Sequence, residues 1–181
     1  MLIYFYLTKN LKFFKVRVKT PVGLVNIKLH NRQAVQTFYS IFIREDYYYS
    51  EKNNTNFIDC GSNIGLASIY FLTRNKNNKV YCVEPDKYNQ RLLQQNLKQF
   101  QGRFFIDKSL VDMENSNKRD FYLSKDGKHS RKLTLGLDYF KEKTKVEAKT
   151  LDKIFTLAYS FFNSDKNITL KIDIEGDEKK I

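Results

Sequence analysis

Apolar and polar residues alternate in the first part of this chain. In residues 11–30, apolar residues alternate with Lys, Arg and Asn on both sides of a Pro-Val-Gly turn. Strict alternation is typical of strands with one buried face, so we predict a β-hairpin here. Residues 1–7 are apolar and indicate a first strand or a weak anchor. Residues 34–48 are apolar and aromatic but follow no clean period.

From residue 57 onward, short apolar runs alternate with longer segments whose apolar residues recur every three or four positions. The short runs predict strands at residues 57–59, 80–83, 104–106 and 168–174. The longer segments predict helices at residues 64–74, at 85–100 and from 151, with Thr150 as the N-cap of the last. Strands and helices that alternate in this way form right-handed βαβ units. We therefore predict an α/β fold with a doubly wound, mostly parallel sheet.

The length of 181 residues suits one domain and is long enough to bury a hydrophobic core. Residues 112–150 interrupt the alternation, and their charged loops flank two short apolar stretches. These stretches predict a small antiparallel insertion at an edge of the sheet. We expect residues 1–50 to form a β-rich extension that packs on a core made by residues 51–181.

Three of the predicted strands end in an acid, namely Asp59, Glu84 and Asp173. Ligands of open parallel sheets bind beyond the carboxyl ends of the strands, so the three carboxylates are expected to meet at one place. The first acid is followed by a loop that contains Gly61 and Gly65. Glycines at such a turn let the backbone approach a nucleotide-like ligand closely.

The loop differs from the dinucleotide fingerprint, because Gly-x-Gly-x-x-Gly is absent. Asn63 stands where a middle glycine could stand, and Asn tolerates the left-handed backbone better than most residues. A pyrophosphate would favour more glycine, whereas a carboxylate-bearing ligand such as S-adenosylmethionine needs less. The sequence also lacks the P-loop motif and any His/Cys/Asp cluster with metal-ligand spacing.

Four ordered motifs of the chain resemble the FkbM family of S-adenosylmethionine-dependent methyltransferases. They are residues 57–65 (FIDCGSNIG), 80–86 (VYCVEPD), 150–152 (TLD) and 171–176 (KIDIEG) followed by Glu178. The resemblance is strongest over residues 57–100 and 150–178. It implies a Rossmann-like methyltransferase fold, with S-adenosylmethionine lying across the ends of the first two strands.

By this resemblance, the loop after the first strand shapes the cofactor site. Asp59, Gly61, Asn63 and Gly65 would hold the methionine moiety, and Glu84 would bind the ribose hydroxyls. Two alternatives remain open from the residues alone. Asp59 could cap the following helix, and Glu84 could be an acid favoured at a helix start by the helix dipole.

The resemblance also assigns residues to the adenine and to the reaction. Ser109 and Leu110 would lie near the adenine, just after the third strand. Asp173 and Glu175 would lie beside the methyl group and the acceptor as catalytic residues. The alternative for these two acids is a plain turn after a buried strand.

The expected reaction is an in-line methyl transfer to an acceptor oxygen or nitrogen, most simply O-methylation. The acceptor would be a sugar, a glycan, a lipid-linked saccharide or a secondary metabolite. Family members continue beyond the fourth strand, whereas this sequence stops at Ile181. We therefore expect a core that lacks its C-terminal strands, and a partner could cover the open sheet edge.

Charge and cysteine content add competing interpretations. The net charge is +12, and residues 1–50 hold eight Lys or Arg against two Asp or Glu. The charges are scattered, which disfavours nucleic acid as the partner. A non-catalytic remnant that binds through its basic N-terminal region is the main alternative to an enzyme, and a nucleotide-dependent oxidoreductase is a third. Two cysteines in apolar runs and no membrane-length apolar stretch favour a cytoplasmic protein.

Overall fold

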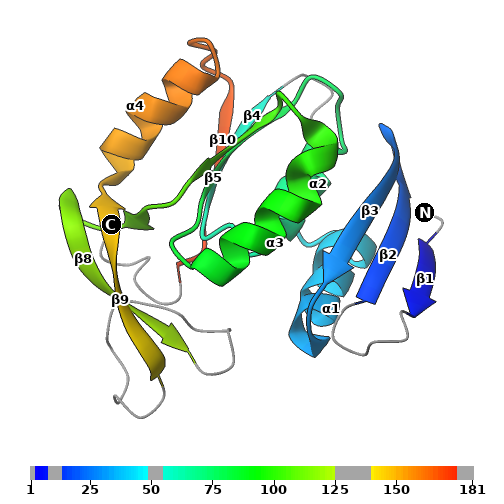
Figure 1. Cartoon of the computed structure of the whole chain (residues 1–181). Helices are drawn as coiled ribbons and strands as arrows, with labels where there is room; N and C mark the ends of the chain where they lie inside the picture. Colours follow the sequence, from blue (N-terminus) through cyan, green and yellow to red (C-terminus); the bar gives the residue numbers. More distant parts are fainter. Residues whose placement is uncertain (1–2, 8–13, 49–54, 125–139, 175–181) are drawn as a thin grey trace.

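The computed structural model describes residues 3–7, 14–48, 55–124 and 140–174 (Figure 1). These residues form a three-stranded N-terminal sheet, a four-stranded central sheet and a second three-stranded sheet. The first and the central sheet share a hydrophobic core, which positions the N-terminal part against the site described below.

The N-terminal sheet is antiparallel, in the order β1-β2-β3. It consists of β1 (Ile3–Leu7), β2 (Phe14–Thr20) and β3 (Gly23–Leu29). The predicted hairpin is therefore confirmed, and the apolar start of the chain includes a strand. In β2 and β3 every second residue is buried, as the alternation predicts.

Residues 34–48 lack a clean period because two kinds of helix follow each other. α1 (Arg32–Phe38) begins at the N-cap Asn31, whose side chain accepts a hydrogen bond from the Ala34 N–H. It continues as the π-helix η1 (Tyr39–Ile43), in which the Arg44 N–H donates to the carbonyl of Tyr39, five residues earlier. A π turn shifts the buried face away from the 3.6-residue repeat, so periodicity fails there.

The central sheet is parallel, in the order β10-β4-β5-β6. Its strands are β4 (Asn56–Cys60), β5 (Lys79–Val83), β6 (Phe104–Asp107) and β10 (Ile168–Ile172). The predicted parallel α/β sheet is thus confirmed. Within the described residues, β10 pairs on one side, with β4.

Helices cover both faces of this sheet (Figure 1). One face carries α2 (Leu66–Leu72) and α3 (Lys87–Leu97), and the other carries α4 (Leu151–Phe161). Thr150 is the N-cap of α4, as predicted. Helix α3 starts later than predicted, because Asp86 rather than Pro85 lies at its N-terminus and accepts hydrogen bonds from two backbone N–H groups. A 3-10 turn, η2 (Lys98–Phe100), follows α3.

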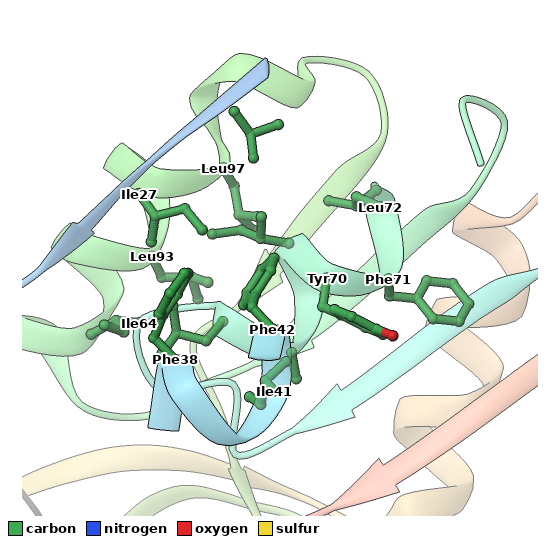
Figure 2. Packing of buried hydrophobic residues seen from close by; sticks show 14 of the residues in the cluster. Ile27, Phe38, Ile41, Phe42, Ile64, Tyr70, Phe71, Leu72, Leu93 and Leu97 are labelled. Carbon is green, nitrogen blue, oxygen red and sulfur yellow. The ribbon is translucent and has the colours of Figure 1, made fainter. Parts of the chain in front are cut away.

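The core between the N-terminal part and α2–α3 is closely packed (Figure 2). Phe42 is fully buried, stacks on Phe38 at a centroid distance of 4.9 Å and meets the Tyr70 ring edge-on at 5.4 Å. Polar contacts reinforce the packing, since the Lys28 N–H donates to Asn96 Oδ1 at 2.8 Å. The described residues of the N-terminal sheet, α1 and η1 therefore pack against α2 and α3.

The insertion forms its own sheet, in the order β7-β9-β8. Its strands are β7 (Leu110–Val111), β8 (Ser116–Ser124) and β9 (Phe140–Lys149). The strands β8 and β9 are antiparallel, as predicted, but β7 pairs with β9 in parallel. The sequence pattern missed β7 because a two-residue strand has no measurable period.

Candidate active site

The loop between β4 and α2 has the backbone that its glycines indicate. Gly61, Asn63 and Gly65 have positive φ angles of 77°, 50° and 86°. A Cβ atom on Gly61 would overlap the backbone carbonyl oxygen of Asp173, and one on Gly65 would lie 2.6 Å from Leu93 Cδ1. Glycine is therefore needed at positions 61 and 65 for two reasons, namely the positive φ angle and the lack of space for a Cβ atom.

Glu84 follows β5 and contacts the loop directly. Its Oε2 accepts a hydrogen bond from the Asn63 N–H at 2.7 Å, and its Oε1 accepts one from the Asp86 N–H at 2.9 Å. The residue is 5% exposed, and burial raises the pKa of its carboxyl to about 7. The N-cap of α3 is Asp86, so Glu84 does more than begin a helix.

Asp59 lies beneath the loop rather than in the open site. Its carboxylate is fully buried, accepts a hydrogen bond from the Ser68 hydroxyl at 2.6 Å and contacts the Lys171 ammonium at 3.0 Å. The residue at the N-cap position of α2 is Gly65, so Asp59 is not the cap of that helix. Asp59 thus holds α2 and β10 against β4.

Lys171 was missed as a site residue in the sequence, although it stands inside the fourth motif. It lies in β10 directly beside Asp59 in the strand register. Its ammonium also donates to the Gly61 carbonyl at 3.2 Å and lies 3.7 Å from Asp173 Oδ2. Burial alone would lower the pKa of this ammonium, but the charges of Asp59 and Asp173 outweigh burial and raise it. The sequence did contain a signal for Lys171, because a single lysine within an apolar strand indicates a buried charge that needs a partner.

Asp173 follows β10 and faces the opening of the site. Its N–H donates to the Cys60 carbonyl at 3.1 Å, which fixes the backbone, while its side chain is 61% exposed. Glu175, the other predicted catalytic acid, lies outside the described residues.

The segment after β6 brings a further acid that the sequence analysis missed. Asp107 is buried and accepts hydrogen bonds from Lys149 Nζ at 2.9 Å to each oxygen and from the Tyr81 hydroxyl at 2.8 Å. Burial opposes ionisation, but these donors keep the pKa of Asp107 below its usual value. It ends an apolar strand, so the rule that selected Asp59 and Glu84 could have found it.

Ser109 and Leu110 follow this acid. The Ser109 N–H donates to Asp107 Oδ1 at 3.0 Å, and the residue is fully buried. Leu110 is buried at the start of β7.

A cavity of about 190 Å³ lies at the carboxyl ends of these strands. Five of the predicted site residues line it, namely Gly61, Asn63, Glu84, Leu110 and Asp173. Three others, Asp59, Gly65 and Ser109, do not line it.

The opposite wall of the cavity comes from residues 30–47, which the sequence analysis did not connect to the site. His30 belongs to this wall, and its buried Nδ1 has no partner in the described part of the chain. Burial lowers the pKa of His30, so its ring is neutral near pH 7.

Across the described ranges, no group of three or more His, Cys, Asp or Glu side chains could hold a metal ion. None of the helices in those ranges has the length and apolar character needed to cross a membrane.

A parallel α/β sheet with a glycine loop and a buried acid at its strand ends defines a class of cofactor-binding proteins. The sequence model of the family described as "Methyltransferase FkbM domain" matches residues 59–181, more than half of the chain. The chain therefore belongs to this family of S-adenosylmethionine-dependent methyltransferases, as its motifs predict.

Other comparisons add little detail. A solved structure described as a "putative RNA methyltransferase" from Pyrococcus horikoshii is 26% identical, with a TM-score of 0.37. The similarity covers 49% of this chain and 44% of that one, so the chain spans less than half the length of that protein. No curated protein matches the chain.

Proposed function

We propose that this chain binds S-adenosylmethionine at the carboxyl ends of β4, β5 and β6 and catalyses transfer of its methyl group. The acceptor atom is an oxygen of a sugar, glycan, lipid-linked saccharide or secondary metabolite. The observation that carries the proposal is Glu84, a buried carboxyl in the cavity wall whose two oxygens each accept one backbone N–H. The Asn89 side chain also hydrogen-bonds this carboxyl, and the acceptor capacity that remains suits ribose hydroxyls.

The residues around Glu84 fit the remainder of the cofactor. Gly61 and Asn63 border the cavity and would face the methionine moiety, while Leu110 would contact the adenine. Ser109 would support the adenine side of the site from behind the wall, because it is buried next to Leu110 and its N–H donates to Asp107 Oδ1. Asp59 and Gly65 act from behind the loop, since neither lines the cavity.

When bound, S-adenosylmethionine supplies an electrophilic methyl group. The chain contributes orientation through the loop and, at Asp173, an exposed carboxylate that can take the proton of an acceptor hydroxyl. Glu175, two residues further on, is proposed to assist in this step. Lys171 holds Asp173 and the Gly61 carbonyl in one cluster.

We also propose that the chain divides into two regions. Residues 1–50 would form a β-rich extension, and residues 51–181 a Rossmann-like methyltransferase core with a doubly wound sheet. Cys60 and Cys82 are both buried and unpaired, which supports a reducing, cytoplasmic setting.

Calorimetry with S-adenosylmethionine and its demethylated product S-adenosylhomocysteine tests the proposal. Glu84→Ala is expected to weaken binding by about 1–3 kcal/mol, because hydrogen bonds to a buried charged group are lost. Glu142→Ala is the matched control, since Glu142 is exposed on β9. Absence of binding by the folded, unsubstituted chain would refute the proposal.

One observation favours a second candidate, a binding module without catalysis. The exposed face of β2 presents Lys15, Arg17 and Lys19 at alternate positions. Binding of RNA or DNA oligonucleotides that falls steeply with salt, together with no cofactor binding, would support this alternative.

A further inference from the structure

The cavity has a different charge from the rest of the protein. The chain carries a net charge of +12, yet Lys171 is the sole Lys or Arg among the described residues that line the cavity. Its ammonium is already engaged, at 3.0 Å from Asp59 and 3.7 Å from Asp173. Among the described residues, the lining therefore offers no available cation to an anionic group of a second ligand in addition to the cofactor's own carboxylate, and burying such a second anion there would be costly.

The wall opposite the strand ends is instead polar and neutral. Gln33 and Thr37 both line the cavity and lie one turn apart on the same face of α1. Neither side chain forms a hydrogen bond within the residues that the structure describes. An amide and a hydroxyl, each able to donate and to accept, are thus presented to the cavity.

Tyr47 extends this wall to the other end of the cavity. It lines the same cavity as Lys171 and Asp173, whose charges both act on its phenol. Burial is the main cause that raises the pKa of Tyr47, so its hydroxyl remains a neutral donor. The face of the ring can also pack against the apolar face of a ligand.

The wall runs along the whole length of the strand ends. At one end, the His30 ring lies edge-on to Tyr88 at 5.7 Å, close to the start of α3, and the charge of Asp86 acts on it. At the other end, Tyr47 lies near Lys171, which is in β10, and near Asp173, which follows β10. A second ligand that meets the cofactor here would contact this wall.

We propose that Gln33, Thr37 and Tyr47 bind the methyl acceptor, and that the part of the acceptor inside the cavity is uncharged and bears hydroxyl groups. The inference rests on the proposed function and narrows its substrate class. These residues all precede residue 59, where the family match begins. In this proposal, residues of the N-terminal extension select the methyl acceptor, and other residues bind the cofactor.

The test measures binding to the full chain saturated with S-adenosylhomocysteine. The probes are neutral methyl glycosides of common hexoses and deoxyhexoses, the corresponding uronic acids and phosphate esters, and a single-stranded RNA oligonucleotide. Calorimetry or ligand-observed NMR should detect neutral glycosides and none of the anionic counterparts. Gln33→Ala and Thr37→Ala should each weaken glycoside binding about fivefold, with S-adenosylhomocysteine affinity unchanged within about twofold.

Gln36→Ala is the matched control, because Gln36 is exposed on α1 and does not line the cavity. Preferred binding of phosphate esters, uronic acids or RNA would overturn the inference, as would binding of no neutral glycoside. A large loss of S-adenosylhomocysteine affinity in Gln33→Ala and Thr37→Ala would make them cofactor contacts and also overturn it. Failure of the unsubstituted chain to bind S-adenosylhomocysteine would instead refute the proposed function.

Discussion

The pKa of Glu84 makes cofactor affinity depend on pH. Burial raises this pKa to about 7, so the fraction of Glu84 that is ionised rises about tenfold between about pH 6 and about pH 8. The ionised form has the acceptors that two ribose hydroxyls need. We predict that S-adenosylhomocysteine binds about tenfold more tightly at the higher pH, as measured by calorimetry.

Glu84→Gln separates this effect from other titrations. The charge of the titratable neighbour Asp86 acts on Glu84, and Asp86 remains in the variant. The affinity of Glu84→Gln should therefore be lower and nearly independent of pH. A variant that retained the full pH dependence would show that another group is responsible.

The ion pair of Lys171 and Asp59 leads to a second prediction for single residues, which concerns the stability of the fold. Lys171→Met leaves the fully buried Asp59 without its cation. We expect the free energy of unfolding to fall by about 3–5 kcal/mol in urea titrations. Lys166→Met, at an exposed lysine, should change it little.

A double variant tests whether the loss comes from an unpaired charge. Asp59→Asn combined with Lys171→Met removes both charges and should recover much of the stability. If the double variant is as unstable as the sum of the two single variants, the two side chains do not interact energetically.

At the scale of elements, the loop between β4 and α2 can lie close to the end of β10 because residue 61 is a glycine. Gly61→Ala adds a Cβ that overlaps the Asp173 carbonyl, whereas Gly102 has the same φ of 77° with nothing within 4 Å of its added Cβ. Gly102→Ala should cost about 1–2 kcal/mol, the cost of the left-handed backbone alone. Gly61→Ala should cost clearly more in chemical denaturation and should weaken cofactor binding. Equal costs would mean that the close contact is readily relieved.

The elements that the sequence could predict are those whose burial repeats regularly. In β2 and β3 one face is buried, and β4 and β5 are buried on both, so alternation or a continuous apolar run marks each of them. The π-helix η1 and the two-residue β7 escaped because neither repeats with the period of a regular helix or strand. Boundaries of α3 were shifted because Asp86, rather than Pro85, caps its N-terminus.

At the scale of the whole molecule, the site joins segments that no local pattern connects. The sequence identified the strand-end acids because each follows its own strand. It could not pair Lys171 with Asp59, which depends on the register of β10 on β4. It also could not place residues 30–47 opposite them, since this follows from how α1 and η1 pack on α2 and α3.

The shared core predicts that the extension and the central sheet unfold together. Phe42→Ala removes a fully buried ring between Phe38 and Tyr70 and should cost about 3–5 kcal/mol. Near-ultraviolet and far-ultraviolet circular dichroism should report one transition at the same denaturant concentration. Two separate transitions would mean that the extension is an independent folding unit.

The pairing of β10 with β4 also has a consequence for biosynthesis. β4 takes its parallel neighbour β10 from 112 residues further along the chain, as the pairing of Ile168 with Asn56 shows. The Gly61 turn rests on Asp173, so it cannot reach its final arrangement until that residue has left the ribosome. The cofactor site is therefore completed only after residue 173 has emerged, and a nascent chain that stalls before that residue exposes an unpaired edge of β4 to chaperones and proteases.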